Sequence, residues 1–92
     1  MPTISIDHSH NQTLDSVRRS LKDLESNLAR QYQLETEWTS DTTLTIERQG
    51  MSGEIIISEA EILVRVELSM MLSFLSGMVE TGLRRELMTR FP

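Results

Sequence analysis

The sequence predicts an α+β domain, a two-layer sandwich in which an antiparallel sheet of about five strands is covered on one face by two helices. Apolar residues recur every three or four positions in two long segments, which is typical of amphipathic helices. They alternate with polar residues in five short segments, which is typical of half-buried strands. The connections between the last four strands are short, which favours antiparallel neighbours and the order β-α-β-β-β-β-α.

The first strand and the first helix occupy the N-terminal third of the chain. Ile4 and Ile6 alternate with polar residues, and residues 8–13 are predicted to form a turn. Thr13 is the expected N-cap of a helix of about five turns. One apolar stripe along this helix is predicted to face the sheet, and it comprises Leu14, Val17, Leu21, Leu24, Leu28 and Tyr32.

Four strand-like segments follow the first helix. The first places Leu34, Thr36 and Trp38 on one face, and the second alternates Leu44 and Ile46 with polar residues. Residues 49–53 contain two glycines and predict a hairpin connection or a bulge. The last two strands are expected over residues 54–58 and 61–68, and the first strand is a candidate neighbour of the last one.

A second helix is predicted from about residue 69 to residue 91. Its core stripe is expected to comprise Leu72, Leu75, Val79, Leu83 and Leu87. Met70, Met71, Phe74 and Met78 add more apolar surface than one stripe needs. Methionine adapts to irregular partners. The surplus therefore predicts either a docking surface or gap-filling inside the core, and the sequence leaves both open.

Composition sets limits on the function. The 92 residues predict one domain over 1–92, and a formal net charge of −5 argues against electrostatic binding of nucleic acid. The chain has no cysteine and no recognisable signal peptide, and its apolar stretch at 68–79 is shorter than the ~20 residues of a membrane span. A cytoplasmic protein is expected.

The candidate catalytic and metal-binding residues favour structural roles. His8 and His10 lie two positions apart, but no third metal ligand follows at a telling spacing, so no metal site is predicted. The many carboxylates are expected to lie on a solvated sheet face, where acid–base catalysis is not favoured. Trp38 is expected in the core or at the rim of a binding surface, and Arg48 in a structural hairpin. We therefore predict no catalytic residues and no cofactor.

Several of these residues, in this order, resemble the polyhydroxyalkanoic acid system family, also called the granule-region family. The resemblance covers nearly the whole chain. It includes the N-terminal Ile-x-Ile strand ending at His10-Asn11, then Glu37-Trp38 with Asp41, then Arg48-x-Gly50-x-x-Gly53, and finally the apolar second helix. Ser69 departs from the family pattern, which usually has glycine after the last strand. The resemblance implies a bacterial protein working near polyester granules or their enzymes, and it supplies no catalytic motif.

The function expected from these observations is that of a non-enzymatic accessory or interaction protein of polyhydroxyalkanoate granule metabolism. Docking is expected through the second helix, by Met71, Phe74, Leu75 and Met78. The expected partner is another protein or the polyester surface, and a homodimer is a further option. The alternative is a small carrier that holds an apolar ligand, such as an acyl chain, between sheet and helices. Such a carrier needs a cavity of at least ~300 Å³.

Overall fold

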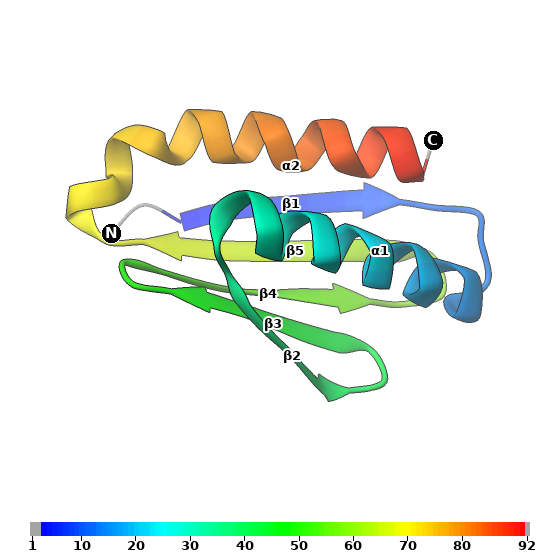
Figure 1. The fold of residues 1–92 in the computed structure, drawn as a ribbon. Helices are drawn as coiled ribbons and strands as arrows, with labels where there is room; N and C mark the ends of the chain where they lie inside the picture. Colours follow the sequence, from blue (N-terminus) through cyan, green and yellow to red (C-terminus); the bar gives the residue numbers. More distant parts are fainter. Residues whose placement is uncertain (1–2, 92) are drawn as a thin grey trace.

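The computed structural model describes residues 3–91 and confirms the predicted α+β class and order of elements (Figure 1). Residues 1, 2 and 92 lie outside the described residues. The elements are strand β1 (Thr3–Ser9), helix α1 (Leu14–Tyr32), strands β2 (Glu35–Ser40), β3 (Thr43–Arg48), β4 (Met51–Ile57) and β5 (Glu61–Leu68), the 3₁₀ helix η1 (Met70–Leu75) and helix α2 (Ser76–Arg90).

The five strands form one antiparallel sheet in the order β1-β5-β4-β3-β2. The last four strands are joined as consecutive hairpins, as the short connections predicted. The first strand pairs with the last, and this register places Ile4 opposite Val66 and Ile6 opposite Val64. The N-terminal strand β1 is therefore an edge strand and has the C-terminal strand β5 as its neighbour. Helix α1 connects β1 to β2, which lies at the opposite edge of the sheet.

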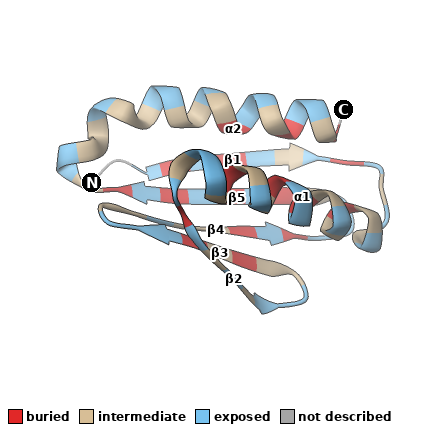
Figure 2. Ribbon diagram, in the orientation of Figure 1, coloured by how far each residue is buried: buried red, intermediate tan, exposed pale blue. Residues whose placement is uncertain are grey.

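The hydrophobic core lies between one face of the sheet and the two helices. Along β5, buried and solvent-facing residues alternate strictly, so Ile62, Val64, Val66 and Leu68 point into the core. The same alternation on the neighbouring strands buries Ile4, Ile6, Leu44, Ile46, Ile55 and Ile57. Figure 2 shows the buried positions as red bands recurring along the strands.

Helix α1 has the predicted cap and the predicted buried stripe. The Thr13 hydroxyl accepts a hydrogen bond from the backbone N–H of Ser16 at 3.2 Å, which satisfies one of the free donors of the first turn. Val17, Leu21, Leu24 and Leu28 are buried against the sheet. The helix ends at Gln33, whose left-handed backbone (φ 56°) lets its N–H bond the carbonyl of Ala29.

Two boundaries differ from the sequence expectation. Strand β1 continues through His8 to Ser9, so the predicted turn is shorter, because His8 pairs with Ile62 of β5. The β3–β4 hairpin turns at Gln49-Gly50 alone, where Gly50 has φ +86°, a conformation that favours glycine. Gly53 lies within β4 and pairs with Ile46 and Val66. Backbone pairing across the sheet therefore extends strands that looked shorter in the sequence.

The predicted second helix is two helices in the structure. Residues 70–75 form η1, and α2 begins at Ser76. The Ser73 hydroxyl donates to the carbonyl of Met70 at 2.8 Å, and serine side chains that bond nearby backbone compete with regular α-helix. The Ser69 N–H donates to the carbonyl of Gly50 at 2.8 Å, which ties the start of η1 to the β3–β4 turn.

Helix α2 packs against β1 and is anchored mainly at its C-terminal end. Leu83 and Leu87 are buried, and so is Phe91 just beyond the helix. The Arg90 guanidinium forms ion pairs with Asp23 of α1 at 2.6 Å and with Glu86 at 3.2 Å. In contrast, none of the six residues of η1 is buried. One end of this C-terminal segment is therefore held in the core while the other stays largely exposed.

Candidate docking surface

Four large hydrophobic side chains are exposed between the start of η1 and the first turn of α2. We call this set the apolar patch, and it comprises Met70, Met71, Phe74 and Met78. Met71 is 85% exposed, Phe74 78% and Met78 69%. Their spacing of three and four residues places these three on one side of the helical path. Three of the four residues predicted to dock are therefore free of the monomer core.

Leu75 was predicted to dock with them, and it is only partly exposed. Leu72 and Val79 are also partly buried and pack against the core cluster. Of the predicted core stripe, only Leu83 and Leu87 are almost completely buried. The stripe is incomplete because η1 reaches beyond the end of the sheet, where no strand covers it (Figure 1). The methionines and Phe74 consequently do not fill gaps in the core.

The apolar patch is also uncharged. Residues 69–79 contain no Asp, Glu, Lys or Arg, whereas residues 80–90 contain five. Transfer of segment 69–79 to an apolar surface therefore desolvates no ionised side chain of the segment itself, which removes the largest cost of such a transfer for these residues. Figure 2 shows the outer side of η1 and of the start of α2 as exposed or half-buried.

Both histidines are bound to backbone carbonyl groups. His8 Nε2 donates to the carbonyl of Phe91 at 2.6 Å, and His10 Nε2 donates to the carbonyl of Ser58 at 2.8 Å. His10 is buried, and its Nδ1 accepts from the N–H of Gln12 at 3.1 Å. Among residues 3–91, no three His, Asp or Glu side chains are grouped so that they could hold a metal ion. The histidines thus join the ends of β1, β4 and α2.

The outer face of the sheet is strongly acidic. It carries one arginine, Arg65, together with seven carboxylates: Asp7, Glu35, Glu37, Glu47, Glu54, Glu61 and Glu67. Glu35 lies directly opposite Glu47, and like charges in that position repel. The same face also carries two apolar side chains, Ile56 of β4, which is 37% exposed, and Leu63 of β5, which is 39% exposed. Two such faces would repel each other, so this surface opposes association of the protein with itself.

Asp7 and Glu61 interact on this face. The hydrogen bond that protonated Glu61 donates to Asp7, the negative charge of Asp7 and desolvation together raise the pKa of Glu61 above its ordinary 4.5. The folded protein therefore holds the Glu61 proton more tightly than the unfolded chain does. This gain in stability is absent at neutral pH, appears as the pH falls through the raised pKa, and is complete below the ordinary pKa.

We expect an NMR titration of the carboxyl signals to place the pKa of Glu61 above its ordinary value of 4.5. Replacing Asp7 by asparagine should return the pKa of Glu61 toward its ordinary value and should remove the rise in stability on mild acidification. An unchanged pKa of Glu61 in Asp7→Asn would contradict the coupling.

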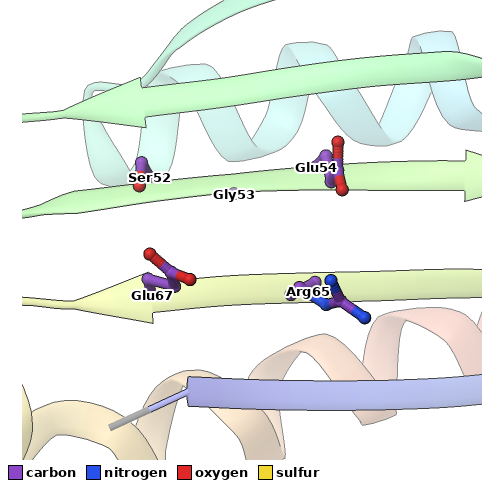
Figure 3. Close-up of a pocket in the computed structure, with 5 residues that line it drawn as sticks. All are labelled: Ser52, Gly53, Glu54, Arg65 and Glu67. Atoms are coloured by element: carbon purple, nitrogen blue, oxygen red, sulfur yellow. The ribbon is translucent and has the colours of Figure 1, made fainter. Parts of the chain in front are cut away.

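A shallow depression of about 230 Å³ lies on the outer face between β4 and β5. Figure 3 shows its five lining residues, Ser52, Gly53 and Glu54 on one strand and Arg65 and Glu67 on the next. The register places Glu54 opposite Arg65 and Ser52 opposite Glu67. The depression is open to water along the outer face of the sheet.

Trp38 and Arg48 both have structural contacts. Trp38 is half-buried, its indole N–H donates to Glu25 of α1 at 3.0 Å, and Arg18 lies 5.3 Å from the ring centre. Arg48 donates to the carbonyl of Tyr32 at 2.8 Å and so caps the C-terminal end of α1. Trp38 thus lies at the edge of the core rather than inside it, and Arg48 is engaged by the helix.

The space enclosed beneath the helices is too small for a carrier. The cavity lined by residues of α1, the sheet and α2, including Leu28, Leu34 and Leu83, has a volume of about 20 Å³. Small-molecule sites usually enclose ~300–1,000 Å³. Among the described residues, no helix is both long enough and apolar enough to cross a membrane.

A family model described as "Putative polyhydroxyalkanoic acid system protein" matches residues 4–91. The comparison with curated proteins gave no match, and neither did the comparison with solved structures.

Proposed function

Because the chain belongs to the polyhydroxyalkanoic acid system family, we propose that it is a non-enzymatic accessory protein of polyhydroxyalkanoate metabolism that docks on the polyester surface through its apolar patch. The family membership confirms the resemblance found in the sequence. We propose that the protein acts in the cytoplasm, and that Met71, Phe74, Leu75 and Met78 make the contact.

The observation that carries this proposal is the exposure of the apolar patch in a segment without charge. Fully burying one Met or Phe side chain contributes roughly 1.5–3 kcal/mol. Met71 and Phe74 are each more than three-quarters exposed, so most of this free energy is still available for binding. The partly buried Leu72 and Val79 pack against the core and give the docking segment a fixed base.

A polyester surface suits the patch better than a shaped protein pocket. A polyhydroxyalkanoate presents alkyl groups and ester groups without net charge along the chain, which matches the uncharged segment 69–79. Three of the four patch residues are methionines, whose unbranched side chains adapt to irregular surfaces. The acidic outer face of the sheet would then remain in water.

The non-enzymatic part of the proposal is supported by how the polar residues are used. The carboxylates are spread over the water-exposed face of the sheet, and both histidines bind backbone carbonyl groups. Neither arrangement provides the buried acid–base pair that catalysis of this kind uses.

The test is co-sedimentation of the purified protein with amorphous polyhydroxybutyrate particles. We expect the double variant Met71→Ser, Phe74→Ser to bind at least about tenfold more weakly, because two large apolar side chains are removed from the contact. Circular dichroism should be unchanged, since neither residue packs in the core.

The matched control is the double variant Ile56→Ser, Leu63→Ser, which removes two partly exposed apolar side chains from the opposite face of the molecule. It should bind the particles like the original protein. Equal losses in both double variants would indicate nonspecific hydrophobic adsorption, and no loss in the first would refute docking through the apolar patch.

A further inference from the structure

An open groove of about 570 Å³ separates the C-terminal end of α1 from α2. Its α1 wall includes Leu28 and Tyr32, and its α2 wall runs from Gly77 to Glu86. The nine steps from Gly77 to Glu86 along the α-helix rise about 14 Å, which gives the length of the groove. The volume lies within the ~300–1,000 Å³ of small-molecule sites, although the groove is open along one side.

Of the two glycines that line the groove, Gly77 leaves it open and Gly82 lies where Tyr32 closes it. A Cβ atom at Gly77 would meet no atom within 4 Å, so a side chain there would extend into free space at the groove. A Cβ atom at Gly82 would lie 3.3 Å from the Tyr32 hydroxyl, so the tyrosine closes the groove at that point. Glycine in a helix interior lowers stability by about 1 kcal/mol relative to alanine. At Gly77 the missing side chain leaves free space in the groove.

The groove combines apolar surface with hydrogen-bond donors. Leu28 and Met78 supply the apolar surface, while Gln31, Tyr32 and Thr81 bring an amide and two hydroxyl groups. An apolar helix from a second protein would cover these donors without satisfying them, and each unsatisfied donor costs free energy. A suitable ligand therefore has carbonyl acceptors along its length as well as alkyl groups.

The groove also carries a free positive charge. Glu86 is the only acidic residue that lines it, and Glu86 pairs with Arg90 at 3.2 Å, while Arg90 also pairs with Asp23 at 2.6 Å. Arg85 lines the groove, and within residues 3–91 no carboxylate forms an ion pair with it. An exposed guanidinium in this position favours a ligand that ends in a carboxylate.

We propose that this groove binds a short linear ester chain with a free carboxylate end, such as a hydroxyalkanoate oligomer, with its alkyl groups on Leu28 and Met78 and its carboxylate at Arg85. The choice of ligand rests on the proposed function, but the site is separate from Met71 and Phe74. It lies between the helices rather than between helices and sheet, where the enclosed cavity is only about 20 Å³.

The test is an NMR titration with a soluble hydroxybutyrate oligomer that has a free carboxyl end. We expect saturable shifts of the amide signals of Gln31, Tyr32, Gly77, Thr81 and Gly82. Gly77→Leu should weaken binding at least about tenfold by filling the groove, and it should fold well because leucine favours helix more than glycine does. Saturating shifts confined to Met70, Met71 and Phe74, or no saturation, would overturn the site.

Arg85→Gln tests the carboxylate contact. We expect about tenfold weaker binding of the free-acid oligomer and unchanged binding of the same oligomer with a methyl-ester end. Arg84→Gln is the matched control, because Arg84 pairs with Glu80 and does not line the groove. Equal affinity of Arg85→Gln and the original protein for the free acid would overturn the assignment of Arg85.

The double variant Met71→Ser, Phe74→Ser separates this inference from the proposed function. It should lose particle binding and keep oligomer binding. If the double variant kept both particle binding and oligomer binding, docking through the apolar patch would be refuted and the groove site would stand. If the original protein did not bind the oligomer, the groove site would be refuted and docking through the patch would stand. Light scattering of the ligand-free protein is the last check, because a dimer that buries the groove would assign it to a second copy of the chain and overturn the proposal.

Discussion

Replacing Phe91 by alanine is expected to lower the free energy of unfolding by about 3 kcal/mol, because it empties a fully enclosed aromatic site in a small core. The Phe91 side chain is completely buried. Its N–H donates to the carbonyl of Leu87 at 2.8 Å, and its own carbonyl accepts from His8 at 2.6 Å. The residue therefore fastens the end of α2 to β1. Urea unfolding followed by the fluorescence of Trp38 gives the measurement.

The matched control for this variant is Phe74→Ala. The same side chain is removed from a position that is 78% exposed, so the free energy of unfolding should change by no more than about 0.5 kcal/mol. A small domain has only about 5–15 kcal/mol of stability, so the two variants should be clearly separated. If Phe91→Ala and Phe74→Ala unfolded at the same urea concentration, the C-terminal anchor would be wrong.

Replacing Gly53 by alanine is expected to destabilise the protein by about 2 kcal/mol, since the added methyl group overpacks the centre of the sheet. An added Cβ atom would lie 2.6 Å from the backbone carbonyl oxygen of Arg65 and 3.1 Å from Val66 Cγ2. The first of these neighbours is backbone in a central strand, so it cannot move without disturbing the β4–β5 pairing.

Gly77→Ala is the opposite case and serves as the control. Its added Cβ atom meets nothing within 4 Å, and alanine favours a helix interior over glycine, so the free energy of unfolding should rise by roughly 0.5–1 kcal/mol. Thermal unfolding by circular dichroism measures both variants. A loss of stability in Gly77→Ala, or none in Gly53→Ala, would contradict the packing described for these two positions.

Charged and apolar side chains lie on different parts of the molecular surface. The acidic face of the sheet carries seven of the 14 acidic residues but one of the nine basic residues. The apolar patch lies on the uncharged segment at the start of the C-terminal helical region. Under the proposed function the protein would bind the polyester by one end and keep its charged sheet in water, which also opposes self-association through the sheet.

The sequence by itself determined the elements and the faces they present. A period of two in the strands and of three to four in the helices is a local property, so it predicted the alternation of β5 and the buried stripe of α1 from Val17 to Leu28. The cap at Thr13 was equally local, because a hydroxyl that accepts from the first turn depends only on nearby backbone. The same period of two accounts for the place of Ile56 and Leu63 on the outer face.

Only the tertiary structure decided what covers each face. The pairing of β1 with β5, the burial of Phe91 and the end of the sheet short of η1 all depend on contacts between residues far apart in the sequence. The apolar stripe predicted over Leu72, Leu75 and Val79 is therefore covered in part, while Met71, Phe74 and Met78 are left in water. The groove depends on how α1 and α2 lie relative to each other. The spacing of apolar residues within one helix says which side chains share a face, but it does not say which element packs against that face.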